Sequence, residues 1–325
     1  MIRRVLVTGG SGYLGSQVVA ALAAAGDCHV VSLDVRQVPP ERRLAGVQYE
    51  VADIRDFAAL ADITLGHGVH TVVHLAAIVT PGRRSDRDFE YQVDVEGTRN
   101  VLRACVAAQV DHLVVSSSGA AYGYHHDNPA WLTETDAVRG NREFAYSWHK
   151  RLVEEMLADY RERAPRLRQT VFRIGTILGA SVSNQITALF DKQRPLAIAG
   201  SDSPFVFIWD QDVVGAILHA IRSGNAGIFN VAGDGALTIH EIAARMGKRC
   251  RVLPPSLLQA ALWVGKRLAL TQYGPEQLRF LQYRPVLDNR RLKDEFGYRP
   301  RMTSSEVFDF WWAARRRAAS APNAT

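Results

Sequence analysis

Tyr146 and Lys150 stand four residues apart, a spacing that places two side chains one turn apart on the same face of a helix. A tyrosine hydroxyl has a pKa of about 10 and is a poor base at neutral pH. A lysine ammonium one turn away favours the phenolate, so the tyrosine can exchange a proton with a substrate hydroxyl. Ser118 ends the run 114–118 and can share that proton. We predict that these three residues are catalytic.

A glycine-rich turn, Gly9-x-x-Gly12-x-x-Gly15, lies much earlier in the chain, between an apolar run and a helical stretch. Glycines let the backbone approach a pyrophosphate that sits on the free N–H groups of a helix N-terminus. The turn therefore predicts a dinucleotide site, to which Tyr13 and Leu14 also contribute.

Asp34 closes the next apolar run, where a carboxylate accepts hydrogen bonds from the adenosine ribose hydroxyls and repels a 2′-phosphate. This position favours NAD as the cofactor. Arg36, two residues later, leaves NADP open and is included in the predicted cofactor site.

The ends of the third and fourth runs supply further cofactor candidates. Asp53 could accept from the adenine amino group while Ile54 covers the ring, or Asp53 could cap the following helix, and both interpretations stay open. His74 is interpreted as a packed histidine at a strand end. Close passage of the cofactor is expected at the residues that follow it, Leu75, Ala76 and Ala77.

These motifs need a scaffold, and the alternation of apolar runs with helical stretches predicts one. Buried runs that alternate with helices indicate a parallel sheet covered on both faces. The fold class is therefore α/β, a doubly wound sheet of Rossmann type. The expected strands are 4–8, 29–33, 47–51, 71–75, 112–116, 169–174 and 229–231.

Beyond residue 180 prolines interrupt shorter elements, which indicates a small, partly helical substrate lobe. We expect a cofactor domain over 1–180 and a lobe over 181–315 from which some elements return to the sheet. Thr238 is the expected cap of a helix with Glu241 in its first turn. Residues 316–325 are expected to form a disordered tail.

Composition restricts the class of protein. The chain of 325 residues has 39 Lys and Arg against 33 Asp and Glu, a net charge of +6. We expect the basic residues to be scattered, which favours small anionic molecules over nucleic acid. The three cysteines are widely spaced and odd in number, so neither disulfides nor a metal site is expected and a cytoplasmic location fits best. No apolar run is long enough to span a membrane.

The stretch 256–270 has the pattern of an apolar helix with Lys266 and Arg267 toward its end. Packing on the small lobe is the simplest interpretation. A contact with a membrane surface and a lid over an apolar substrate are the alternatives.

Together these motifs resemble the extended short-chain dehydrogenase/reductase family, which holds nucleotide-sugar epimerases and dehydratases. The resemblance covers about residues 3–300, in matching order and spacing, and is strongest to a branch grouped with UDP-glucose 4-epimerases. It implies a small-molecule substrate and a homodimer. The segments that carry it are 8–15, Asp53, 74–77, 97–100, 117–123, 146–150 and 229–233.

Departures from the family pattern bear on the substrate. Gly119 and Ala120 replace the Asp-Glu pair that the family's dehydratases carry, which argues against water elimination. Thr176 and Phe205 replace an Asn and an Arg that hold the nucleotide in UDP-sugar epimerases, so an apolar lining is expected unless Arg173, Arg279 or Arg284 compensates. The predicted substrate residues are Thr80, Ser118, Gly119, Ala120, Thr176, Phe205 and Phe207.

Two further departures lie beside the catalytic residues. Asp94 replaces an Asn that in related enzymes holds a water chain to the catalytic lysine, and an ionised Asp accepts hydrogen bonds without donating them. His149 replaces the usual Ser before Lys150 and is interpreted as a helix-surface residue.

The resemblance and the residues together predict an NAD-dependent enzyme that transfers a hydride at a secondary alcohol or ketone. Sugar epimerisation is the first hypothesis. A dehydrogenase of an apolar, steroid-like or polyketide-like alcohol is the alternative, because both would use Ser118, Tyr146 and Lys150 in the same way. A non-catalytic dinucleotide sensor is a third, although sensors commonly lose the tyrosine that this chain retains.

Overall fold

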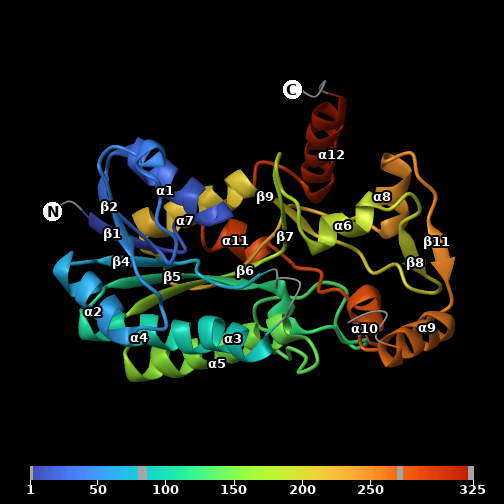
Figure 1. Ribbon diagram of the computed structural model, residues 1–325, viewed down its shortest axis with the longest axis horizontal. Helices are drawn as coiled ribbons and strands as arrows, with labels where there is room; N and C mark the ends of the chain where they lie inside the picture. The colour runs from blue at the N-terminus through green and yellow to red at the C-terminus, as the bar shows by residue number, and fades with distance from the viewer. Residues whose placement is uncertain (1–2, 80–85, 269–273, 321–325) are drawn as a thin grey trace.

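The alternating runs form a seven-stranded parallel sheet in the computed structural model, which describes residues 3–79, 86–268 and 274–320 (Figure 1). The strand order is β10-β6-β5-β4-β1-β2-β3, and every neighbouring pair is parallel. All seven expected strands are present. Their bounds are β1 (Arg3–Thr8), β2 (Cys28–Asp34), β3 (Val47–Val51), β4 (Thr71–His74), β5 (His112–Ser118), β6 (Arg168–Ile174) and β10 (Gly227–Val231).

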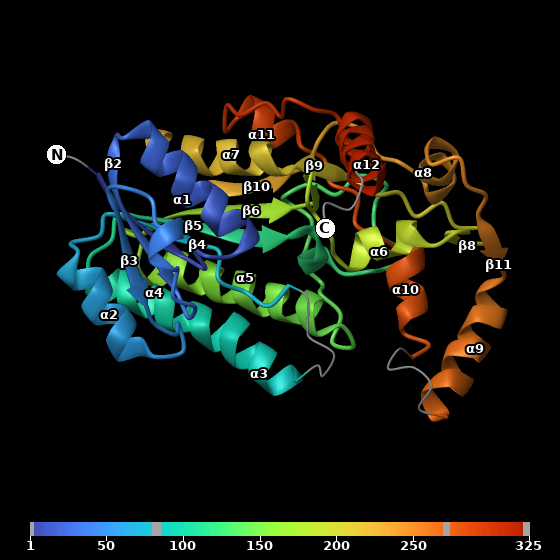
Figure 2. The same cartoon turned by 45° about the horizontal axis from the view of Figure 1, so that its top comes forward.

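Helices cover both faces of this sheet, as Figure 2 shows. One face packs under α1 (Tyr13–Ala25), α7 (Asp210–Ser223) and the short α11 (Arg290–Asp294). The other packs under α2 (Phe57–Gly66), α4 (Gly97–Ala107) and α5 (Ala145–Arg163). Each layer encloses its own apolar core, so the predicted doubly wound α/β class is confirmed.

The position of the ligand site follows from the strand order. β1 lies between β2 and β4, so the chain leaves β1 toward one edge and later returns to its other side. In doubly wound sheets a crevice opens at such a reversal, beyond the carboxyl ends of the strands. The glycine turn after β1, residues 75–77 after β4 and Ser118 at the end of β5 all lie at this edge.

The smaller lobe is built from two pairs of short parallel strands and several helices. Strand β7 (Thr176–Leu178) pairs with β9 (Phe207–Trp209), and β8 (Leu196–Ile198) pairs with β11 (Arg251–Leu253). Both α7 and β10 come from the second half of the chain and return to the main sheet. The remaining helices are α3 (Arg87–Tyr91), α6 (Gln185–Asp191), α8 (Ile239–Arg245), α9 (Pro255–Arg267), α10 (Gln277–Gln282) and α12 (Ser304–Ser320).

Two expectations for the lobe have different outcomes. Thr238 caps α8 in a reciprocal box, because its hydroxyl accepts from the Glu241 amide and the Glu241 carboxylate accepts from the Thr238 amide at 2.7 Å. The expected disordered tail is wrong for residues 316–320, which continue α12. Arg315 pairs with Asp191 at 2.6 Å and lies over the Trp311 ring, and these contacts hold the last turns of the helix. Residues 321–325 lie outside the described part.

The helices within the described ranges were compared with the length and hydropathy of a membrane span, and none of them is both long and apolar enough to cross a bilayer.

A buried ion pair fixes α5, which carries Tyr146 and Lys150, on the sheet. The Arg173 guanidinium on β6 donates to the Glu154 carboxylate on α5 at 2.6–3.0 Å, and both side chains are almost fully buried. Ser117 donates to the same carboxylate at 2.5 Å, and Arg173 also donates to the Tyr122 hydroxyl at 2.8 Å. Since Glu154 lies one turn after Lys150 and Ser117 precedes Ser118, the network sets the two catalytic elements against each other.

Replacing Glu154 with Gln should lower the free energy of unfolding by about 3 kcal/mol, because it leaves a buried guanidinium without its countercharge. Urea unfolding followed by circular dichroism measures this loss. The neighbouring Glu155→Gln is the matched control, since Glu155 pairs with Arg151 at 2.7 Å on the surface and such pairs contribute less than about 1 kcal/mol. Equal losses in the two variants would contradict the assignment.

Candidate active site

The glycine turn brings two backbone segments into close contact. Gly9 has φ +70°, in the left-handed region that favours glycine, and a Cβ at this position would lie 2.8 Å from the Ala76 amide nitrogen. A Cβ at Gly15 would meet the Gly9 carbonyl oxygen. The structure therefore places the predicted segment 75–77 directly against the turn, with no room for side chains on the glycines.

The start of α1 offers free donors at this turn. Gly12 precedes the helix without a side chain that could cap it, so the first N–H groups remain available to an anion. The Ser11 hydroxyl is buried and has no hydrogen-bond partner among the described residues. A backbone cradle without Cβ atoms, free N–H groups and an unsatisfied hydroxyl fit the pyrophosphate of a dinucleotide.

Tyr13 and Leu14 were expected to contact the cofactor. The Tyr13 hydroxyl donates to the Asp210 carboxylate at 2.5 Å, and burial together with this carboxylate raises the pKa of Tyr13 to about 12. The contact ties the start of α1 to the start of α7. Leu14 is half-buried against the core under these helices.

Asp34 lies at the end of β2 with its carboxylate beside the turn. It accepts from the Ser11 amide at 3.1 Å and from the Arg36 amide at 3.0 Å. Burial opposes ionisation of Asp34, but the hydrogen bonds from Ser11 and Arg36 outweigh it, so the pKa of the carboxyl is lowered. The group is ionised at neutral pH and retains lone pairs for ribose hydroxyls. The exposed Arg36 side chain lies 3.6 Å from the same carboxylate.

Asp53 and Ile54 have separate surroundings. The Asp53 carboxylate accepts from the Arg55 guanidinium at 2.6 and 2.9 Å, and Arg55 lowers the pKa of Asp53. The interpretation of Asp53 as a helix cap is wrong, because Asp56 caps α2. Ile54 is buried in the core, where its side chain lies under Gly97. This placement turns Ile54 toward the interior of the sheet layer.

The three predicted catalytic residues meet at the carboxyl edge of the sheet. Tyr146 lies in the first turn of α5 and is half-buried, while Lys150 is buried one turn later. The Lys150 ammonium donates to the Ser116 carbonyl at 2.9 Å and lies 5.6 Å from the centre of the Tyr146 ring. Ser118 ends β5, and its hydroxyl oxygen accepts from the Ala120 amide at 3.1 Å. The lysine thus links the tyrosine to the strand that carries the serine.

His74 is a packed histidine, in agreement with its interpretation. Its ring nitrogens lie 2.7 Å from the Thr8 hydroxyl and 3.0 Å from the Thr98 hydroxyl. Burial, with a smaller effect of the Lys150 charge, lowers the pKa of His74 to about 3. The neutral ring therefore joins the ends of β1 and β4 to α4 by hydrogen bonds.

His149 is not a helix-surface residue, and this interpretation was wrong. Its side chain is 3% exposed, and Nδ1 lies 3.2 Å from an Asp94 carboxylate oxygen. The second Asp94 oxygen accepts from the Ile78 amide at 2.8 Å, just after the segment that passes the glycine turn. The Asp94–His149 pair thus connects the catalytic helix with the segment after β4. Its two members occupy positions where the family pattern has Asn and Ser, and that joint departure was the signal in the sequence.

The predicted substrate residues are only partly brought together. Gly119 and Ala120 follow Ser118 in a short buried 3₁₀ turn at the catalytic edge. Thr176 is half-buried on β7, where its amide donates to the Val206 carbonyl at 3.1 Å. Phe205 and Phe207 are 2% and 0% exposed and belong to the core of the lobe, so an apolar pocket wall built from them is not what the structure shows. Thr80 lies outside the described residues.

The three arginines considered for an anionic substrate have different surroundings. Arg173 is committed to Glu154 in the interior. Arg279 is exposed and pairs with Glu143 at 3.0 Å. Arg284 instead lies over the Phe205 ring, with its guanidinium carbon 3.9 Å from the ring centre. Of the three, Arg284 alone has no carboxylate partner among the described residues.

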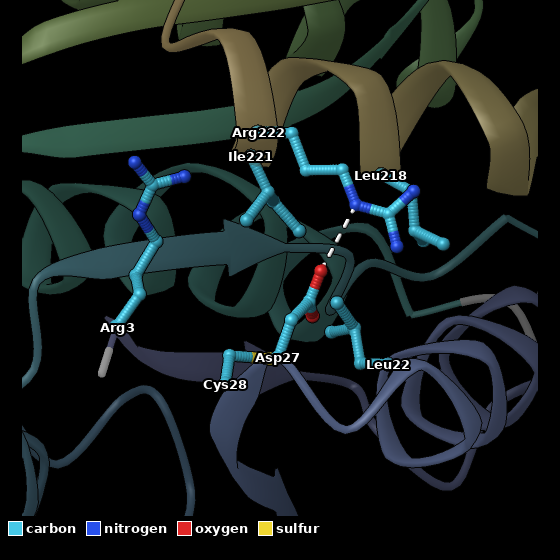
Figure 3. A pocket seen from close by; sticks show the side chains of 7 residues that line it. All are labelled: Arg3, Leu22, Asp27, Cys28, Leu218, Ile221 and Arg222. Carbon is cyan, nitrogen blue, oxygen red and sulfur yellow. Dashed lines mark hydrogen bonds and ion pairs between the residues drawn. The ribbon is translucent and has the colours of Figure 1, made fainter.

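A pocket of about 230 Å³ lies at the opposite end of the sheet, as Figure 3 shows. Its lining includes Arg3 and Cys28 at the amino ends of β1 and β2. Arg222 at the end of α7 pairs there with Asp27 at 3.1 Å. Because the catalytic edge is the carboxyl end of the same strands, this pocket takes no part in the site.

The family model for NAD-dependent epimerases and dehydratases matches residues 5–232, more than half of the chain. The chain belongs to the NAD-dependent epimerase/dehydratase family. Members of this family are enzymes that depend on NAD, and the cradle at the glycine turn fits that cofactor. The predicted extended short-chain dehydrogenase/reductase class is therefore confirmed.

Relatives with curated names agree with this family. An uncharacterised protein of Mycobacterium tuberculosis is 27% identical over 96% of this chain and 84% of its own length. The UDP-glucose 4-epimerase of Yersinia pestis is 32% identical over 62% of this chain and 60% of its own length.

Solved structures of family members share the fold. A UDP-glucose 4-epimerase of Thermotoga maritima with UDP-glucose superimposes with a TM-score of 0.75 at 20% identity, covering 98% of this chain and all of its own. The UDP-glucose 4-epimerase of Thermus thermophilus in complex with NAD has a TM-score of 0.70 at 25% identity, covering 96% of this chain and 99% of its own.

We expect NAD(H) to bind at least about tenfold more tightly than NADP(H), because a 2′-phosphate would meet the ionised Asp34 carboxylate at short range. Fluorescence titration with NADH and NADPH measures the two dissociation constants. Asp34→Ser should bring the two dissociation constants closer together. NADH should bind more weakly because it loses the ribose contact, and NADPH more tightly because its phosphate no longer meets a carboxylate. Tighter binding of NADPH to the wild-type protein would contradict the role of Asp34 and assign the ribose contact to Arg36.

Asp94→Ala should weaken NADH binding by about tenfold, because it removes the acceptor that holds the Ile78 amide and the segment after β4. Asp94→Asn should retain most of the affinity, since its amide oxygen can still accept that hydrogen bond. The same titrations give the result, with thermal unfolding of the cofactor-free variants as the control for folding. Wild-type affinity in Asp94→Ala would exclude this positioning role.

Proposed function

We propose that this protein catalyses NAD-dependent hydride transfer at a secondary alcohol or ketone of a sugar-like, anion-bearing substrate, with epimerisation as the net reaction. The observation that carries the proposal is the meeting of Ser118, Tyr146 and Lys150 at the same sheet edge as the dinucleotide turn. Family membership supports the reaction class, and the relatives named as UDP-glucose 4-epimerases support epimerisation.

The residues of the site divide the proton chemistry among them. Tyr146 takes the proton of the substrate hydroxyl, and the Lys150 charge one turn away stabilises the phenolate form before the transfer. Ser118 holds the same substrate oxygen by a hydrogen bond. NAD, when bound, supplies a hydride acceptor that can also return the hydride. When the hydride returns to the opposite face of the carbonyl carbon and Tyr146 returns the proton to the carbonyl oxygen, the product is the epimer.

Arg284 supports an anionic group on the substrate. Its guanidinium lies between the Phe205 and Phe280 rings, and its Nε is buried with no hydrogen-bond partner in the described parts of the chain. Burial lowers the pKa of Arg284 to about 9, because no carboxylate stabilises the charge. Its Nη1 donates to oxygens of Ser203 and Leu281. A phosphate or carboxylate would provide the missing countercharge.

The arginine lies near the catalytic tyrosine. The Phe280 ring connects the two regions, because Arg284 lies 5.4 Å from its centre and the same ring packs on Tyr124 and Phe144. Burial raises the pKa of Tyr124 well above its usual range. A pocket of about 480 Å³ opens beside Tyr124, between the segment 124–127 and Tyr283. The lining of this pocket also includes Arg139 and Arg279, so it is basic where it opens beside the ring cluster.

A dehydrogenase of an apolar alcohol remains the second candidate, because aromatic rings also border the catalytic residue. Tyr124 packs edge to face on Phe144 and Phe280, with ring centres 5.2 and 5.1 Å away. Phe144 lies two residues before Tyr146. These rings could cover an apolar ring system, but they leave the Arg284 charge without a partner.

Two further predictions concern assembly and location. The homodimer rests on the family resemblance, and the cytoplasmic location rests on the cysteine content. The non-catalytic sensor is disfavoured by the intact set of Ser118, Tyr146 and Lys150.

Replacing Tyr146 with Phe should lower turnover at least about a hundredfold at nearly unchanged NADH affinity, because it removes the proton-transferring hydroxyl and keeps the ring. Epimer formation from UDP-glucose, followed by chromatography, and NADH titration provide the two readouts. Tyr160→Phe, which removes a hydroxyl from the same helix away from the site, is the control. Turnover near the wild-type level in Tyr146→Phe would refute the proposed role.

Arg284→Gln should weaken binding of UDP-glucose to the NAD-loaded protein by about tenfold or more, because a charged hydrogen bond to the diphosphate is lost. Calorimetry measures this binding, and Arg222→Gln is the control because that arginine is exposed, pairs with Asp27 and lies at the opposite end of the sheet. Weak, millimolar binding that does not respond to Arg284→Gln would favour the apolar alcohol instead.

A further inference from the structure

Helix α9 is apolar on two sides, and only one side is packed. Leu258 and Leu262 face inward and join a small core with residues of β8 and α10. On the other side Leu257, Val264 and Leu268 are 55%, 45% and 62% exposed. Their spacing of seven and four residues places them on one stripe along the helix. The packed side is covered by the rest of the lobe. The exposed stripe has no partner among the described residues.

A large aromatic residue flanks the stripe. Trp263 is 55% exposed, and the Arg267 guanidinium lies 5.6 Å from the centre of its ring. Exposed Leu and Trp beside Arg on a helix is the composition of an interfacial amphipathic helix, in which the aromatic ring and the basic side chain lie at the level of the lipid headgroups.

Acidic residues are missing from the sequence around this helix. Residues 242–275 contain six Lys and Arg and no Asp or Glu, an excess equal to the net charge of +6 of the whole chain. Some of these cations have partners, such as Lys266, which pairs with Glu276 at 2.9 Å. Arg249, Arg251 and Arg267 are exposed and have no carboxylate within ion-pair distance in the described ranges.

We propose that the exposed stripe of α9 docks on an anionic lipid surface. The apolar stripe would enter the headgroup region, and the three unpaired arginines would attract acidic lipids. A second copy of the chain fits this surface poorly, because an antiparallel two-fold contact would bring Arg251 of each copy toward Arg267 of the other without a countercharge. Helix α9 also lies at the end of the molecule far from the N-terminus in both ribbon views (Figures 1 and 2).

The docking surface lies one helix away from the substrate cleft. Helix α9 packs on α10, and Phe280 of α10 contacts Tyr124 and Phe144 beside the catalytic tyrosine. Docking would therefore hold the substrate lobe, rather than the cofactor domain, against the lipid. The proposal does not depend on the reaction catalysed, and its test measures binding alone.

Co-sedimentation with vesicles tests the proposal. The probes are vesicles of phosphatidylcholine alone and vesicles that contain about a third of phosphatidylglycerol, an anionic lipid. We expect the wild-type protein to bind the anionic vesicles, to bind the neutral ones at least about tenfold more weakly, and to be released by salt.

Matched variants separate the contributions. Val264→Glu should lower binding at least about tenfold, because it places a carboxylate in the stripe. Val106→Glu is its control, since Val106 on α4 has the same exposed fraction of 45%. The double variant Arg251→Gln/Arg267→Gln should also lower binding by about tenfold or more, whereas Arg166→Gln, at another exposed arginine, should not. NADH binding by each variant checks that it is folded.

Several results would overturn the proposal. Absence of binding to anionic vesicles, or equal binding to neutral and anionic ones, excludes an anionic lipid surface. Equal loss in Val264→Glu and Val106→Glu places the contact elsewhere. If light scattering shows a dimer that Val264→Glu dissociates, the stripe is an interface between two copies of this chain.

Discussion

The buried pair of Glu154 and Arg173 is the contact on which the catalytic geometry depends. Two charges removed from water are stable only when they satisfy each other with good hydrogen-bond geometry, so α5 has one acceptable position over β6. That position places Tyr146 and Lys150 at the carboxyl edge. The Ser117 hydroxyl donates to the same Glu154 carboxylate and thereby fixes the end of β5 against the same helix. A shift of α5 along the sheet would break all of these contacts together.

The predicted cofactor site depends on the close approach of two backbone segments rather than on a charge pair. Gly9 and Gly15 remove the Cβ atoms that would separate the turn from the segment 75–77. Asp94 then positions the end of that segment, because its carboxylate accepts a hydrogen bond from the Ile78 amide. The same carboxylate contacts the His149 ring. The residue before the catalytic lysine is thus connected to the wall of the dinucleotide site. A perturbation of cofactor position and a perturbation of α5 are expected to influence each other through this pair.

These two regions also show what the sequence can predict. Strand periodicity, the glycine turn, Asp34 and the Tyr-Lys spacing are local patterns, and each one specifies its structure within a few residues. The burial of His149 was not predictable in this way, because its partner Asp94 lies 55 positions away. The core position of Phe205 depends on neighbours from several elements of the lobe. A histidine on a helix shows its partner only when the chain is folded. The end of α12 was missed because Asp191, far away in sequence, holds it.

The same difference explains why the reaction class is better defined than the substrate. Every group proposed to move a proton or to hold the dinucleotide belongs to a compact motif in the first 150 residues, so a local sequence pattern is enough to find it. The substrate lobe is assembled from short strands and helices whose contacts join distant positions, as when Arg284 lies on Phe205 and bonds to Ser203. The family pattern has an Arg where this chain has Phe205. Arg284, from a different segment of the chain, can supply a guanidinium in its place. The substrate preference proposed for this chain therefore depends on contacts between distant residues, whereas the proton chemistry proposed for Tyr146 depends on a local pattern.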